Sequence, residues 1–438
     1  MKQFFMAMAF GLTAAALHAG PLPAPVDDSS YRAVSMAEAR LGHLLFYDPI
    51  LSGNKTVACA TCHHPKFGTG DGLSLGFGDG GIGLGPDRQA DPDNMPIQRI
   101  PRNAPSLFNL GAHEFQVMFH DGRLEADATK PSGIRTPMGE DMVQGFASVL
   151  AAQTMFPVLS RDEMAGDYNE NELGKLIRQG RITGAGGAWD VLARRVAEIP
   201  AYADAFVATY PHVSGPEDIA FTDISNAIAV FMEHEWRSDT APFDDVLRGK
   251  NELAGPAARG LELFYGELRC ARCHAGPFLT DHRFHAMGDP QIGPGKSATF
   301  EDHYRDDGRF RVTGDPGDRY AFRTPSLRNV MLTAPYGHAG AYSDLRAYLA
   351  HHSDPVAGLA SYSLASATLP AFSQRDDAIL RDNGLLAEIA QSATQQPQTL
   401  SPNTLDDLVA FLETLTDPVA IEGRLGVPDA VPSGLPVP

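Results

Sequence analysis

Apolar residues recur at helical spacing shortly after the start of the chain. Ser35 and Glu38 form a capping box, a signature of a helix N-terminus. The apolar positions that follow are Leu41, Leu44 and Leu45. This spacing predicts an amphipathic helix that ends before Pro49.

The same kind of pattern returns in the second half of the chain. Pro256 marks an expected helix start, with apolar residues following at Leu261, Phe264 and Tyr265. Helical spacing also appears between residues 155 and 211, over Phe221–Trp236, and behind a Ser401-Pro402-Asn403 cap. Strand signals are weak, so we predict a mainly α fold class.

Two short motifs follow the two matching helices: Cys59-Ala60-Thr61-Cys62-His63 and Cys270-Ala271-Arg272-Cys273-His274. Together they use all four cysteines of the chain. The C-x-x-C-H pattern is typical of c-type haem attachment, in which two thiols bond the haem and the histidine binds its iron. A zinc site or a disulfide is less compatible, because no matching cluster of Cys and His ligands lies nearby in the sequence.

The segments around the motifs are paired. "LGHLLFYDP" before the first motif matches "GLELFYGEL" before the second, and "RNAPSLFN" downstream matches "FRTPSLRN". We interpret this pairing as the duplication of a one-haem unit, giving two cytochrome c-like haem domains in tandem with long loops. The expected organisation is a signal peptide at 1–19, an N-terminal domain at 20–240 with a helical insertion, and a C-terminal domain at 241–438.

The amino-acid composition predicts a cellular compartment and disfavours some kinds of partner. An apolar stretch from Phe4 to Leu17, followed by Ala19-Gly20, predicts a signal peptide, periplasmic export, and no membrane span after cleavage. The formal net charge of −19 disfavours nucleic acid and anionic membranes and suits a basic protein partner. The sequence leaves open whether the chain forms a homodimer.

Several longer strings are more specific than the haem motifs. "LSGNKTVACATCHHP", "FHDGR" and the segment 314–340 resemble the bacterial dihaem cytochrome c peroxidase and MauG family. The resemblance implies that the N-terminal haem reacts with hydrogen peroxide and that the C-terminal haem takes electrons from outside. The donor would be a small periplasmic protein such as a cytochrome c or a cupredoxin.

The resemblance also implies roles for residues of the first haem. His63 would be the proximal iron ligand. A distal glutamate is expected some twenty residues beyond the family's tryptophan, a place that His120 holds here; the count reaches Glu140, with Asp141 as the neighbouring alternative. His120 could still relay by hydrogen bonds, although an imidazole is harder to oxidise than an indole.

At the second haem His274 would be proximal, and the family's count to the sixth ligand reaches His352. His351, Tyr348 and Met287 remain alternatives. The family also binds calcium between its domains, and the matching positions are Asn103, Thr333 and Pro335. The expected partners of the haem propionates are Arg102, Arg323 and Arg328.

Three functions are compatible with these residues. The first is a cytochrome c peroxidase, and the second is a MauG-like oxidase that uses peroxide to modify residues of a partner protein. The third, a plain electron carrier, is disfavoured because a carrier needs both irons closed to peroxide.

The loop after the first motif yields a spectroscopic prediction. Many dihaem peroxidases carry a histidine there that blocks the iron, whereas no histidine occurs between His64 and His113 in this chain. We therefore expect the first haem to be five-coordinate and high-spin as isolated, without reductive activation. An EPR spectrum of the ferric protein should show one high-spin and one low-spin haem, and two low-spin signals would contradict the hypothesis.

Overall fold

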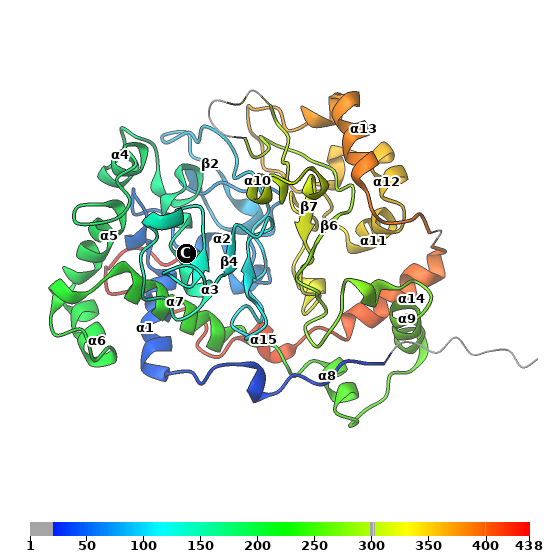
Figure 1. The fold of residues 1–438 in the computed structure, drawn as a ribbon, viewed down its shortest axis with the longest axis horizontal. Coiled ribbons are helices and arrows are strands. Elements are labelled where there is room, and N and C mark those ends of the chain that lie inside the picture. The colour runs from blue at the N-terminus through cyan, green and yellow to red at the C-terminus, as the bar shows by residue number, and fades with distance from the viewer. Residues whose placement is uncertain (1–20, 298–300, 302, 399) are drawn as a thin grey trace, which may run out of the picture.

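The computed structural model describes residues 21–297, 301, 303–398 and 400–438, so the expected signal peptide lies outside the described residues. The fold is mostly helical, and the predicted helices are confirmed (Figure 1). Those of the first half are α1 (Met36–Tyr47), α2 (Cys59–Cys62), α3 (Val149–Thr154), α4 (Glu172–Arg178), α5 (Ala188–Ala197), α6 (Pro200–Thr209) and α7 (Phe221–Glu235). Those of the second half are α8 (Pro242–Leu247), α9 (Gly255–Tyr265), α10 (Phe310–Thr313), α11 (Leu345–Ser353), α12 (Pro355–Ser361), α13 (Asn383–Ser392), α14 (Pro402–Glu413) and α15 (Pro418–Glu422).

The predicted helix starts coincide with side-chain caps. Ser35 accepts a hydrogen bond from the backbone N–H of Glu38 at the start of α1. Ser401 accepts one from Thr404 at the start of α14. Each cap satisfies a backbone donor that has no partner within the helix.

Three short antiparallel sheets connect the helices. Their strands are β1 (Gly81–Ile82) with β2 (Gln89–Ala90), β3 (Val117–Met118) with β4 (Leu124–Ala126) and β5 (Ile134–Arg135), and β6 (Phe284–Ala286) with β7 (Ala321–Arg323). The β4–β5 hairpin and the loop after it fill the chain between the "FHDGR" string and α3.

The two halves repeat one packing arrangement. In the first half α1 packs on α7, and in the second half α9 packs on α14. Both crossings depend on a glycine. A Cβ atom at Gly42 of α1 would lie 1.8 Å from the carbonyl oxygen of Ala227, and one at Gly260 of α9 would lie 1.9 Å from that of Asp407. Each glycine stands five residues before the tyrosine that ends its helix, so the duplication seen in the sequence is also a duplication of geometry.

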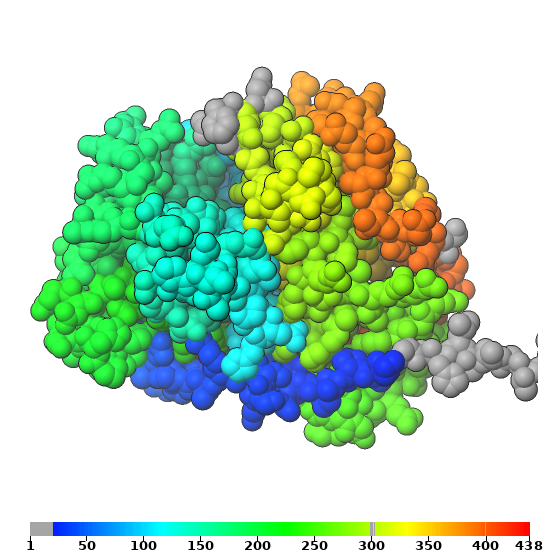
Figure 2. Space-filling model, in the orientation of Figure 1, coloured from blue at the N-terminus to red at the C-terminus, as the bar shows by residue number. Residues whose placement is uncertain are grey.

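The halves lie side by side, and both chain ends cross between them (Figures 1 and 2). The N-terminal segment passes along α8, where Arg248 donates to the carbonyl of Val26. The tail at 418–438 returns to the first half, whose core includes Ala420 and Val431. The C-terminal domain expected at 241–438 therefore contributes its last residues to the packing of the first half.

No helix of the described residues is long and apolar enough to cross a membrane.

The glycine crossings predict a stability effect. G42A and G260A should each destabilise the protein by about 1–3 kcal/mol, because a methyl group would collide with backbone of the facing helix, which cannot rotate away. Urea unfolding measures the difference. G384A on α13 is the control, since its methyl group would meet only the Asp382 side chain at 3.2 Å. Equal effects at all three positions would refute the close-packing explanation.

Candidate haem centres

The first C-x-x-C-H motif forms a short helix that leads directly into its histidine. Cys59 and Cys62 are the first and last residues of α2, and His63 is its C-cap residue. The His63 Nδ1–H donates to the carbonyl oxygen of Thr69 at 2.9 Å. Thr69 is held in the left-handed backbone region, at φ 64°, and its hydroxyl accepts from the N–H of Leu107. The tautomer fixed in this way leaves Nε2 free to bind a metal.

The second motif repeats this arrangement. His274 Nδ1–H donates to the carbonyl oxygen of Leu279 at 3.2 Å, and Leu279 is also left-handed, at φ 51°. Burial, with His352 nearby, lowers the pKa of His274 to about 4, so the imidazole is neutral, as a metal ligand must be. Both motif histidines are thus oriented as proximal ligands.

A cavity with about 1140 Å³ of empty space opens beside the first motif. Cys59, Cys62 and His63 form part of its wall, and much of the remaining wall is apolar. The apolar lining includes Phe46, Val57, Leu107, Phe119, Leu150, Met164, Ile228 and Met232. An apolar chamber with attachment thiols and an oriented imidazole at one wall fits a covalent haem.

Two polar side chains in this cavity have the properties of a reactive site. Glu163 lies on a π-helical turn, Arg161–Ala165, a feature that is frequent at functional sites. Burial raises the pKa of Glu163 above its usual range, and Lys296 and Arg123 partly offset this effect. Gln153 of α3 also lines the cavity, and its Oε1 atom has no hydrogen-bond partner. A carboxyl group and an amide therefore share the chamber with His63.

The structure corrects the expectation for Glu140. The Glu140 side chain is 79% exposed, pairs with Lys130 on the surface, and does not line the cavity. Asp141, the alternative, is exposed as well. The chain between His120 and Glu140 runs through the β4–β5 hairpin and reaches the surface, so the fixed count of twenty residues ends away from the cavity. The carboxylate that the sequence offered for this role is Glu163, which follows the helical stretch that carries Gln153.

His120 does line the cavity, as predicted for a residue near the first haem. Its Nε2–H donates to the carbonyl oxygen of Asn103 at 3.1 Å. Burial and the nearby Arg102 lower its pKa to about 3, so the imidazole is neutral at ordinary pH. The carbonyl of His120 accepts from the N–H of Arg323 in the second half, which places the residue on the boundary between the halves.

At the second centre the structure distinguishes the candidate sixth ligands. The rings of His352 and His274 have centroids 6.4 Å apart, and the Nδ1 atom of His352 has no hydrogen-bond partner. Metal–nitrogen bonds of about 2 Å on both sides, plus about 1 Å to each ring centre, would give a separation of about 6 Å. His351 is instead buried against Asp289, with 3.3 Å between Nε2 and Oδ1. The geometry therefore favours His352 over its neighbour.

Relatives of the chain agree with two haem centres. A sequence profile described as di-haem cytochrome c peroxidase matches residues 36–252. Methylamine utilization protein MauG of Methylorubrum extorquens is 27% identical over 405 residues, 91% of this chain and 84% of that protein. Cytochrome c551 peroxidase of Pseudomonas aeruginosa is 27% identical over 332 residues, 74% of each chain. The chain belongs to the di-haem cytochrome c peroxidase and MauG family.

Solved structures of this family have the same fold. A MauG-like protein associated with microbial copper homeostasis is 26% identical, with a TM-score of 0.57 over 94% of this chain and 97% of that one. The diheme peroxidase BthA from Burkholderia thailandensis aligns over 96% of this chain and 97% of its own, with a TM-score of 0.58. At 19% identity, the likeness to BthA shows the fold alone.

The calcium positions implied by the family lie near the boundary of the halves. Asn103 donates its backbone N–H to the carbonyl of His338, and its Nδ2 to the carbonyl of Leu73. These bonds leave the amide oxygen Oδ1 for a cation. Thr333 and Pro335, the other two positions, precede His338 in the sequence.

The three arginines expected at the haem propionates differ in their partners. Arg102 is committed to Asp306 and Asp121, and Arg328 to Asp244 and the carbonyl of Pro277. The remaining one, Arg323, is half-buried, and no carboxylate of the described residues pairs with it. Its Nε donates to the carbonyl of Phe119, its Nη1 atom has no partner among the described residues, and desolvation lowers its pKa to about 10. A partly desolvated guanidinium without a carboxylate fits the propionate that a haem of this family would bring to the site.

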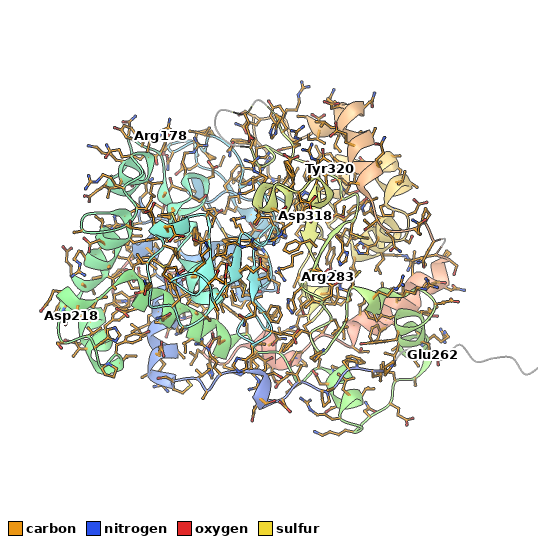
Figure 3. All side chains as sticks on the ribbon, in the orientation of Figure 1. Arg178, Asp218, Glu262, Arg283, Asp318 and Tyr320 are labelled. Carbon is orange, nitrogen blue, oxygen red and sulfur yellow. The ribbon has the colours of Figure 1, made fainter. Side chains whose placement is uncertain are left out.

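This unpaired charge predicts a redox shift. R323M should lower the reduction potential of the haem that it faces, because a buried cation favours the more negative, reduced state. Spectroelectrochemical titration measures the change. R283M removes the same charge from an exposed position directly before β6 (Figure 3) and should shift the potential much less. Equal shifts would show that Arg323 does not meet a propionate.

Proposed function

We propose that the chain is a periplasmic dihaem peroxidase that reduces hydrogen peroxide at its N-terminal haem. Electrons would reach that haem through the C-terminal haem from a small electron-donor protein. The observation that carries the proposal is Glu163, a half-buried carboxyl group that lines the same cavity as His63. A plain electron carrier has no use for a proton-transfer group in that position.

Reduction of peroxide needs two electrons and two protons, and one proton must move between the oxygens. Glu163 is the group suited to take a proton from the bound peroxide oxygen and to deliver one to the leaving oxygen. Its raised pKa brings it nearer to the range in which both steps are accessible. Gln153 offers an amide to orient peroxide, and the apolar wall excludes water. The haem, when bound through Cys59 and Cys62, supplies the redox-active iron.

The second centre has the properties of an electron port. We propose His274 and His352 as its two axial ligands, both neutral because burial lowers the pKa of each. Ligation by two histidines gives a lower potential than histidine with methionine. His120, on the boundary between the halves, would relay by hydrogen bonds and not as an oxidisable side chain.

The remaining parts of the proposal rest on features of the amino-acid sequence. The haem domains would span 20–240 and 241–438, with calcium held at Asn103, Thr333 and Pro335 between them. Export through the signal peptide would place the protein in the periplasm. The negative charge favours a basic partner, such as a small cytochrome c or a cupredoxin.

A second candidate is a MauG-like oxidase that modifies a partner protein. Two observations favour it: the first-haem loop has no histidine to block the iron, and His352 stands where peroxidases of the family have methionine. Steady-state consumption of peroxide with reduced cytochrome c separates the candidates. Fast turnover supports the peroxidase, and negligible turnover supports the modifying oxidase.

The role of Glu163 predicts a pair of mutants with opposite outcomes. E163Q should lower kcat/KM for peroxide by about 10²–10⁴-fold, because the amide cannot transfer the proton. E140Q removes a charge from the exposed ion pair with Lys130 and should leave turnover close to that of the wild type. Loss of activity in E140Q with retention in E163Q would overturn the assignment.

A further inference from the structure

A group of aromatic side chains packs around His352. Tyr348, one turn before it on α11, has its ring centre 5.1 Å from that of His352. Tyr342 follows at 5.6 Å from Tyr348, and Tyr362 lies 5.3 Å from Tyr342. Tyr336 stacks on Tyr348 from another side, at 5.9 Å. The rings form a path from His352 to Tyr362, the residue that follows α12.

The hydroxyl groups in this path have different partners. The Tyr348 hydroxyl donates to Asp289, 3.4 Å from each carboxylate oxygen. The Tyr336 and Tyr362 hydroxyls donate to backbone carbonyls, those of Val330 and Ala341. Tyr348 is thus the member whose proton faces a group that can accept it.

Asp289 is built into this site. Asp289 is half-buried, and two imidazoles face its carboxylate. His351 Nε2 lies 3.3 Å from Oδ1, and His338 Nδ1 lies 3.7 Å from Oδ2. Both ring nitrogens of His338 and of His351 lack other hydrogen-bond partners. Removal of an electron from a phenol makes its O–H strongly acidic, so oxidation of a tyrosine needs a proton acceptor within reach. The Asp289 carboxylate, flanked by two imidazoles, is such an acceptor.

We propose that Tyr348 is a redox-active tyrosine that donates an electron to the second haem, and that Tyr342 and Tyr362 extend the path toward the surface. This inference rests on the proposed function, which supplies hydrogen peroxide as the oxidant. The haems, which His63 and the pair His274 and His352 would hold, would supply the two electrons that reduce peroxide to water. Tyr348 would return one electron to the second centre, its O–H bond would break, and the proton would pass to Asp289. The product is a neutral tyrosyl radical.

The experiment uses the holoprotein mixed with hydrogen peroxide in the absence of any electron donor. Freeze-quench EPR should show an organic radical that narrows when the protein is grown with ring-deuterated tyrosine. Y348F should reduce the yield of this radical at least tenfold, and D289N should also reduce it by removing the proton acceptor. Y336F is the matched control, because it removes a neighbouring hydroxyl that has no carboxylate partner, and it should leave the yield unchanged.

The haem absorption spectrum, followed in the same mixing experiment, distinguishes failure of the Tyr348 proposal from failure of the proposed peroxidase function. If peroxide changes the haem spectrum and no tyrosyl radical forms, or if Y348F retains the radical, the role of Tyr348 is overturned and the peroxide reaction stands. If peroxide leaves the haem spectrum unchanged, the proposed function fails, and the relay that depends on it fails as well. An unaltered ferric spectrum in Y348F verifies that the second haem is intact in that variant.

Discussion

One buried guanidinium holds the halves of this protein in register. Arg102 of the first half donates two hydrogen bonds to Asp306 of the second half and one to Asp121 of its own half. Burial alone would raise the pKa values of both aspartates, but Arg102 holds each of them below its usual range. Loss of one member of such a cluster leaves an uncompensated buried charge, which typically costs about 3–5 kcal/mol. Because Arg102 also lines the first cavity, the shape of that cavity depends on the contact between the halves.

The two centres are alike on the side of the motif histidine and differ on the opposite side. Each proximal histidine is tied to the carbonyl of a left-handed residue, Thr69 or Leu279, so the duplicated unit has kept its means of orienting a ligand. The opposite sides have diverged. The first centre faces an open cavity with Glu163, whereas the second faces the imidazole of His352. The proposed difference in reactivity therefore depends on residues far from the motifs.

Local chemistry explains what the sequence could predict. Capping residues, glycine and proline positions and apolar spacing are short-range signals, and they located α1, α7, α9 and α14 correctly. The repeated strings identified both centres because the same local contacts occur in each half. Glu163 was missed because a fixed count along the chain does not follow the path that the β4–β5 hairpin takes in space. The pairing of Arg102 with Asp306 joins residues that are 204 positions apart, and no local signal carries that information.

The choice between His351 and His352 shows a similar limit. The two residues are consecutive on α11, so they point about 100° apart around the helix. Which of them faces His274 depends on the rotation of α11 in its tertiary packing. In this packing His351 lies against Asp289, which belongs to a loop distant in the sequence, so no local signal predicts the rotation.

The return of the tail to the first half has a consequence for biogenesis. Glu235 at the end of α7 accepts backbone hydrogen bonds from Leu425 and Gly426, and Asp48 accepts one from the hydroxyl of Ser433. The core of the N-terminal half is therefore complete only when the last residues of the chain are available. Until then Cys59 and Cys62 belong to an incomplete fold, in which their thiols stay open to the covalent haem attachment that the family implies.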